Sequence, residues 1–302
     1  MSSSKNQLLE GIFSKKMALC LSLGFASGMP LFVVLTLLGA YLRKEGVNLK
    51  EIGLFSLIMI PYTWKFVWSP LVDRYNLFHL GRRRSWMLIS QIAVFFSIFL
   101  LGQFSPKTSL SVIAAVSVIL SFASATQDIV IDAYRREILT DRELGLGTSL
   151  FITASRASSL VPGGLSLVIA QFLSWSDVFF ITAAFMLPAL VVTFFIKEPE
   201  TINAPRNLRQ AIIEPFREFK DRRGLKSMFL IILFVFCYKL GDSMATALAT
   251  PFYIDLHYDL LTIGLVAKNA GLWSMLIGGI LGGVIMLKTG INKALWYFGF
   301  GQ

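Results

Sequence analysis

Apolar stretches about twenty residues long follow one another along the chain and are separated by charged segments. Eight of them are long enough to cross a hydrocarbon layer of about 30 Å as α-helices, at residues 17–42, 52–72, 86–105, 109–131, 145–173, 177–196, 227–250 and 260–287. A ninth begins at Ala294, and the chain ends within it at Gln302. The pattern predicts an all-α integral membrane protein with eight full transmembrane helices and the start of a ninth, truncated at its C-terminus.

The charged segments predict how these helices are grouped and oriented. Twenty of the 28 basic residues lie on one side of the predicted membrane, four on the other side and four inside helices. Basic residues favour the cytoplasmic side, so we expect a cytoplasmic N-terminus. Three regions follow: a six-helix bundle at 1–196, a cytoplasmic connector with an amphipathic helix at 197–226, and an incomplete second bundle at 227–302.

Composition agrees with a membrane protein and excludes several other classes. The chain is 55% hydrophobic and only 15% charged, where a soluble domain has about a quarter of its residues charged. The net charge of +10 is explained by basic loops facing anionic lipid, without nucleic acid as a partner. The sequence contains no zinc-protease motif, nucleophile elbow or phosphate loop, so we expect neither an enzyme nor a bound metal or cofactor.

A charged motif follows the second apolar stretch. Residues 69–74 read SPLVDR and, after six more residues, 81–84 read GRRR. An acid and a base followed by clustered arginines fix a helix end at the cytoplasmic surface. We expect a conformational latch here, joined by an acid from the end of the fourth predicted helix; its residues are Asp73, Arg74, Gly81, Arg82, Arg83 and Asp132.

Ionisable residues inside the first predicted bundle are candidates for a transport pathway, because a charge at bilayer depth costs a few kcal/mol. Lys65 lies in the second predicted helix and either lines the pathway or reaches back to the interface. Asp128 lies at a depth close to that of Arg156. Two interpretations remain open: a structural Asp128–Arg156 ion pair, or a carboxylate that gains and loses a proton during transport.

The second predicted bundle carries a further charged cluster. Lys239 and Asp242 are three residues apart in the seventh predicted helix, near the depth of Lys268 in the eighth. Two lysines and one aspartate leave an excess positive charge that suits an anionic substrate; mutual neutralisation without substrate contact is the alternative. Glycines at close-packing spacing, such as Gly24 and Gly28, predict tight helix contacts.

Several segments resemble AmpG-type muropeptide permeases of the major facilitator superfamily. They are LGFASGMPL (23–31), WKFVWSPLVDR (64–74), SATQDIVIDA (124–133) and YKLGD (238–242). The resemblance implies a bacterial inner-membrane permease that imports anhydro-muropeptides by proton symport for peptidoglycan recycling. It also implies that Gly28, Ala125, Gln127 and Asp128 lie in segments that the family needs.

The same resemblance implies at least twelve helices, more than the apolar pattern supplies. A second chain that provides the missing helices is therefore an expected partner, besides the small-molecule substrate, protons and membrane lipid. The alternatives are an inactive or split-gene remnant of such a permease, or a carrier for another solute such as acetyl-CoA.

Overall fold

The chain forms two compact units, residues 1–204 with 278–302 and residues 205–277. The computed structural model describes residues 14–199 and 268–290, and positions 224, 226–227, 229–230, 233–234, 293–294 and 298. Most of these residues belong to the first unit, which the following paragraphs concern. The predicted connector and the predicted seventh helix lie almost wholly outside the described residues.

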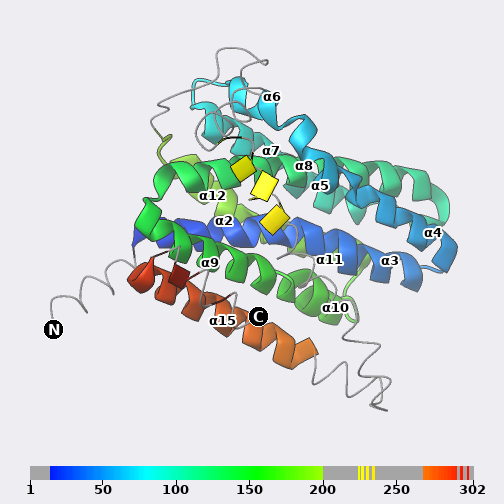
Figure 1. Cartoon of the computed structure of the whole chain (residues 1–302). Helices are drawn as coiled ribbons and strands as arrows, with labels where there is room; N and C mark the ends of the chain where they lie inside the picture. Colours follow the sequence, from blue (N-terminus) through cyan, green and yellow to red (C-terminus); the bar gives the residue numbers. More distant parts are fainter. Residues whose placement is uncertain are drawn as a thin grey trace. The chain divides into compact units, whose positions relative to one another are not determined.

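Long apolar helices dominate the first unit (Figure 1). Five helical stretches of the described chain are long and apolar enough to cross a membrane: Lys15–Lys44, Arg82–Leu101, Pro106–Ile138, Asp141–Ile169 and Trp175–Phe195. They confirm the predicted first, third, fourth, fifth and sixth spans. Their elements are α2 (Lys15–Phe32), α3 (Gly39–Lys44), α7 (Arg82–Leu101), α8 (Pro106–Ile138), α9 (Asp141–Ala157), α10 (Ser166–Ile169), α11 (Trp175–Ala184) and α12 (Leu187–Phe195).

The second predicted span folds as a series of short helical pieces. Three α-helical pieces alternate with 3₁₀ turns, in the order α4 (Leu49–Leu54), Phe55–Met59, α5 (Ile60–Trp64), Lys65–Val67 and α6 (Ser69–Arg74). Pro61 and Pro70 stand at the starts of α5 and α6. At these positions a backbone N–H would have no partner within the helix, so its absence costs nothing. The same prolines prevent one continuous α-helix, because each removes a donor and crowds the preceding turn.

Side-chain caps fix where the long helices begin. The Ser14 hydroxyl accepts a hydrogen bond from the Met17 amide at the start of α2. Thr140 and Glu143 form a reciprocal capping box at the start of α9. Glu143 also binds the ammonium group of Lys16 at 2.9 Å. This ion pair joins the first turns of α2 and α9.

Glycines allow α2 and α9 to approach closely, as their spacing predicts. A Cβ atom on Gly24 would overlap the carbonyl oxygen of Phe151, and one on Gly28 would overlap that of Ser155. Because the obstacle is backbone, a side-chain rotation cannot relieve either overlap. Two glycines four residues apart therefore let the two backbones touch.

The part of α15 (Lys268–Thr289) that belongs to the first unit packs on the same helix, α9, from Gly278 onward. A Cβ atom on Gly283 would lie 2.8 Å from the Ser149 side chain, and one on Gly279 would lie 3.0 Å from the Thr153 hydroxyl. Small residues thus bring α15 and α9 together. Residues 268–287 of the predicted eighth span are thus helical, and its first residues are not described.

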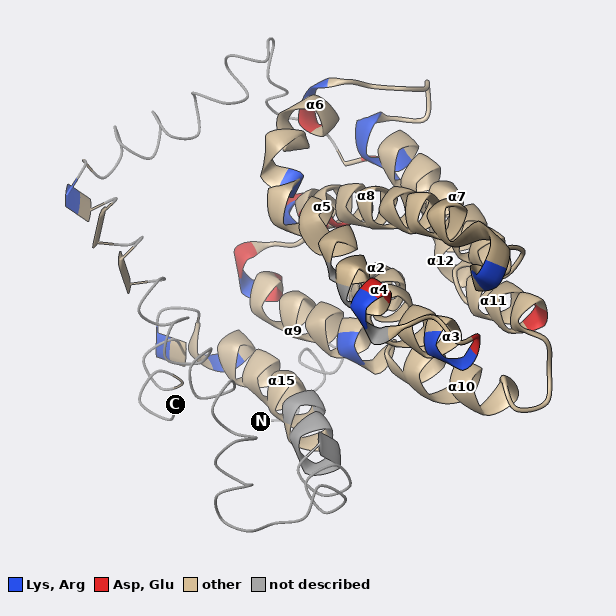
Figure 2. Cartoon of the chain, turned by 90° about the vertical axis from the view of Figure 1, so that its right-hand side faces the viewer, with Lys and Arg blue, Asp and Glu red and all other residues tan. Residues whose placement is uncertain are grey.

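Charged residues of the helices lie mostly at their ends, with long uncharged stretches between (Figure 2). The helix interiors instead pack large apolar side chains, among them the fully buried Met29, Leu37, Ile98, Leu120 and Phe179. A charged side chain away from the helix ends therefore needs a specific explanation.

The glycine contact gives the first testable prediction. We expect Gly24→Ala to destabilise the protein by about 1–3 kcal/mol, because the new methyl group overlaps the Phe151 backbone. Gly39→Ala is the matched control, since Gly39 is also helical and has no atom within 4 Å of the added Cβ. Thermal unfolding of the detergent-solubilised chain measures both. Equal stability of the two variants would contradict the close contact.

Candidate functional site

Asp128 is a largely buried acid held by two other segments of the chain. The Ser27 hydroxyl of α2 donates a 2.6 Å hydrogen bond to Asp128 Oδ1. The Lys65 ammonium group lies 3.6 Å from Asp128 Oδ2. Ser27, Lys65 and Asp128, here called the Asp128 triad, come from three different apolar segments. They form a polar site away from the ends of α8.

The 3₁₀ turn that carries Lys65 is fixed against α8 by a neighbouring aromatic residue. Trp68 donates its indole N–H to the Thr126 hydroxyl at 3.1 Å and stacks on Phe122, with ring centroids 4.6 Å apart. A polar and an apolar contact together hold the turn at one height on α8. The broken helix thereby places an ammonium group opposite Asp128.

Three serine hydroxyl groups lie on the same face of α8 as Asp128. Ser117, Ser121 and Ser124 precede Asp128 at helical spacing and are fully buried. The Ser121 hydroxyl and both amide atoms of Gln127 have no hydrogen-bond partner among the described residues. Burying such a group without a partner costs about 1–3 kcal/mol. Gln127 is therefore a buried amide beside Asp128 whose hydrogen-bonding groups are unused in the described part of the chain.

The structure pairs Asp128 with a different base from the one expected. Arg156 is exposed on α9 and is not the ion-pair partner of Asp128, whereas Lys65 is. Ala125 is fully buried in α8, and Gly28 lies at the contact between α2 and α9, next to Ser27. Lys239, Asp242 and the side chain of Lys268 lie outside the described residues.

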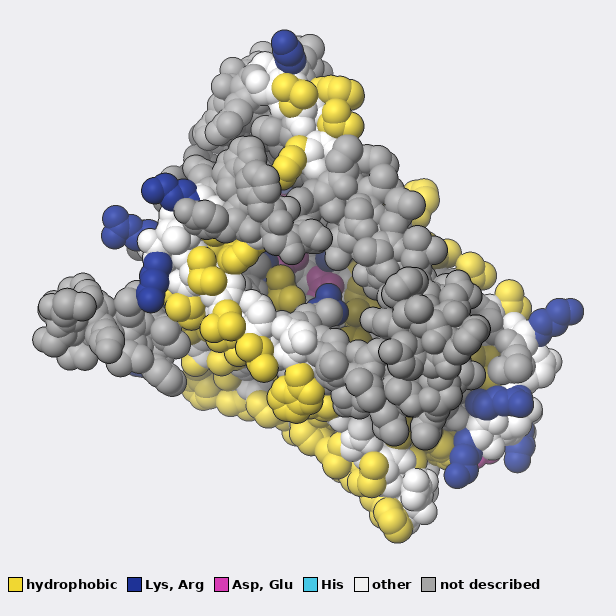
Figure 3. Space-filling model, turned by 60° about the horizontal axis from the view of Figure 1, so that its bottom comes forward, with side chains coloured by type: hydrophobic (Ala, Val, Ile, Leu, Met, Phe, Trp, Pro, Cys, Tyr) yellow, Lys and Arg dark blue, Asp and Glu magenta, His cyan; other side chains and the backbone are white. Residues whose placement is uncertain are grey.

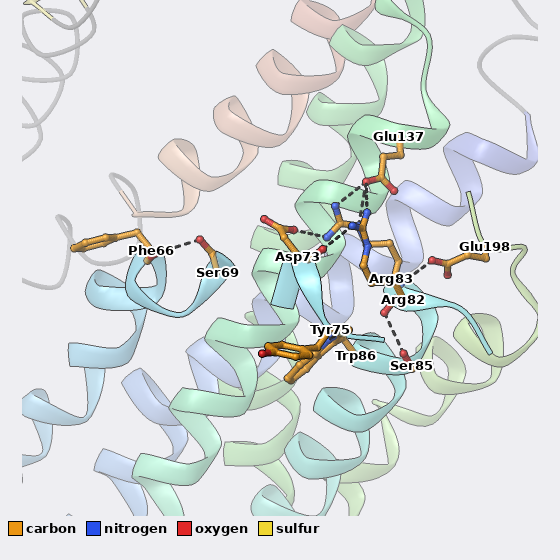
Figure 4. A network of polar contacts seen from close by, with 10 residues as sticks. All are labelled: Phe66, Ser69, Asp73, Tyr75, Arg82, Arg83, Ser85, Trp86, Glu137 and Glu198. Carbon is orange, nitrogen blue, oxygen red and sulfur yellow. Dashed lines mark hydrogen bonds and ion pairs between the residues drawn. The ribbon is translucent and has the colours of Figure 1, made fainter. Parts of the chain in front are cut away.

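A second polar cluster joins the ends of four elements (Figure 4). Arg83, at the start of α7, is buried and binds Asp73 of α6 at 2.6 Å and Glu137 of α8 at 2.7 Å. Arg82 contacts Glu137 at 3.7 Å and donates to the Asp73 carbonyl. Glu198, just beyond α12, accepts hydrogen bonds from the backbone amides of Arg83 and Arg84 at 2.8 and 3.0 Å. We call these contacts the latch network.

Gly81 is required where the latch network begins. Its φ of +102° belongs to the region that side-chain-bearing residues rarely adopt. A Cβ atom there would lie 2.5 Å from the Glu198 side chain. Gly81 therefore lets the Glu198 carboxylate reach the exposed amides at the N-terminus of α7, where a negative charge is favourable.

Two expected latch residues have other partners. Asp132 binds Arg135 on its own helix at 3.0 Å, and its side chain is half exposed. The acid of α8 that binds the arginines is Glu137, about a turn and a half beyond Asp132. Arg74 lies over the ring of Tyr75, with 5.2 Å between its Cζ atom and the ring centroid.

Three residues of these clusters were not identified from the sequence. Ser27 is one hydroxyl among many in apolar segments, and Glu198 is 115 positions away from the amide that it binds. Glu137 could have been identified from the sequence, because the helical pattern of α8 continues beyond its apolar part. No group of three or more possible metal ligands occurs in the described part of the chain.

Sequence comparison decides the family. The Major Facilitator Superfamily profile matches residues 17–302. A protein of Rickettsia felis that carries an AmpG name is 30% identical, over 93% of this chain and 70% of its own length. The chain belongs to the major facilitator superfamily, in its AmpG branch.

Two further relatives match nearly the whole of this chain and different shares of their own length. An uncharacterized protein of Haemophilus influenzae is 45% identical over 98% of this chain and 71% of its own length. The anhydromuropeptide permease of Escherichia coli K12 is 38% identical over 98% of this chain and 60% of its own length. This AmpG-type chain thus spans between three fifths and three quarters of these relatives.

The latch network gives the second testable prediction. We expect Glu137→Gln to destabilise the protein by about 2 kcal/mol, because it weakens a charged hydrogen bond to the buried Arg83. Asp132→Asn is expected to change stability by less than about 0.5 kcal/mol, as a half-exposed pair within one helix does. Chemical or thermal unfolding in detergent compares the two. A larger loss in Asp132→Asn would contradict this assignment.

Proposed function

We propose that this AmpG-type chain takes part in the proton-driven import of anhydro-muropeptides across the bacterial inner membrane. The name of the Escherichia coli relative supports the substrate, and the Asp128 triad supports proton coupling. The excess of basic residues on one side of the predicted membrane supports an N-terminus in the cytoplasm.

Asp128 is the proposed proton carrier, and its surroundings are the observation that carries the proposal. Removal from water disfavours the charged carboxylate, while Lys65 and the Ser27 hydroxyl favour it. A carboxylate balanced between these effects changes protonation when the distance to Lys65 or the access of water changes. Rearrangement of the helices during transport would change both.

The proposed role of the latch network is to hold one end of the helical bundle in a single arrangement. Arg83 contacts α6 and α8 through side chains, and its amide contacts the segment after α12. A buried arginine with two carboxylate partners separates only when other groups take their place. Such a cluster suits a switch between two discrete packings better than a gradual movement.

The direct test is uptake of labelled anhydro-muropeptide by Gram-negative cells that lack their own permease and express this chain. We expect accumulation that an uncoupler abolishes. Normal abundance of the chain in the membrane without uptake would contradict transport by this chain alone.

The third testable prediction concerns Asp128. We expect Asp128→Asn to reduce gradient-driven uptake at least about a hundredfold, as loss of a required proton-transfer group does, with unchanged abundance in the membrane. Asp141→Asn is the matched control, because Asp141 is a largely exposed acid paired with an exposed arginine. Normal accumulation by the Asp128→Asn variant would exclude Asp128 as the proton carrier.

A further inference from the structure

The two bonds that hold Asp128 differ in strength. The Ser27 hydroxyl donates at 2.6 Å, whereas the Lys65 ammonium group lies at 3.6 Å. Charge-assisted N–H···O bonds are normally about 2.7–2.9 Å long. Ser27 therefore fixes the carboxyl group in place, and Lys65 can leave Asp128 without displacing it.

Lys65 is also partly exposed. Its side chain is 35% exposed, and that of Asp128 is 18% exposed. Figure 3 shows acidic and basic side-chain atoms at the surface together, between hydrophobic side chains. The flexible stem of a lysine lets its ammonium group turn from one acceptor to another while the backbone stays fixed. The Trp68–Thr126 hydrogen bond keeps that backbone beside α8.

We propose that Lys65 is a shared counter-ion: it pairs with Asp128 when that acid is ionised, and with a carboxylate of the substrate when Asp128 is protonated. This inference rests on the proposed function and deepens it, because it names the substrate group that Lys65 recognises. The peptide part of a muropeptide carries such carboxylates.

Charge balance in the site favours this exchange. An ionised Asp128 and Lys65 together have no net charge. When a proton neutralises Asp128, the partly buried ammonium group of Lys65 loses its charged partner, which raises its energy. A bound carboxylate restores neutrality. Proton binding and carboxylate binding therefore stabilise each other, which is the requirement for coupling.

Few other groups compete for Lys65 in the described part of the chain. Tyr62 and Asp132 are close enough to Asp128 to interact with it electrostatically. Asp132 is already paired with Arg135, and a tyrosine hydroxyl is uncharged at ordinary pH. Ser27, on α2, carries no charge. Among these neighbours, Asp128 is the acid that alternates with the substrate.

The test measures binding to the purified chain of labelled anhydro-muropeptide and of an analogue whose carboxyl groups are amidated. We expect the Asp128→Asn variant, although inactive in uptake, to bind the acid form about tenfold more tightly than the wild type at mildly alkaline pH. Wild-type affinity is expected to rise as the pH falls, whereas the affinity of Asp128→Asn should not follow that change. Lys65→Gln should weaken binding of the acid form but leave the amidated form unchanged, and Lys65→Arg should restore part of the loss.

The outcomes separate the two proposals. If the wild type binds muropeptide but Asp128→Asn does not tighten binding, or if Lys65→Gln weakens both ligands equally, the shared counter-ion is wrong and the proposed function stands. If the wild type binds no muropeptide, both are wrong. The double variant Lys65→Gln with Asp128→Asn is the control for misfolding, because it removes both charges and leaves neither of them unpaired. It should fold and should lose the gain that Asp128→Asn gives.

Discussion

The cost of a charge in apolar surroundings is the constraint on which the account of this chain depends. Only 18% of the Asp128 side chain is exposed, so it needs partners from other segments, and the fold supplies them from α2 and from the turn after α5. The glycine contact between α2 and α9 gives α2 its position, and Trp68 positions the turn. Much of the local packing thereby determines the environment of one carboxyl group.

The same constraint explains the contrast between the two polar clusters. The latch network is a dense set of short bonds around a buried arginine, with two acids and a glycine that admits a third. The Asp128 triad has one short bond and one long one. The first arrangement stabilises a particular packing of helix ends, and the second leaves an ammonium group free to exchange partners. The two proposed roles, holding a conformation and carrying a proton, need these opposite properties.

The sequence was sufficient for the long helices of the first unit, except for the broken second span, and for the contact through Gly24 and Gly28, because apolar length and small-residue spacing are local signals. It was not sufficient for the partner of Asp128. Depth was counted along straight helices, but the segment that carries Lys65 contains 3₁₀ turns, which rise about 2.0 Å per residue instead of 1.5 Å. Glu137 was missed because α8 continues past its apolar part. Glu198 was missed because a contact across 115 positions leaves no periodic pattern.

The central claim is that Asp128 takes up a proton in the course of transport. Infrared difference spectroscopy of the purified chain in lipid tests it most directly, because a protonated carboxyl group has a carbonyl band that a carboxylate lacks. We predict that substrate addition produces such a band in the wild type, and that the band is absent in Asp128→Asn. The same band in Asp128→Asn would place the proton on another group and contradict the account.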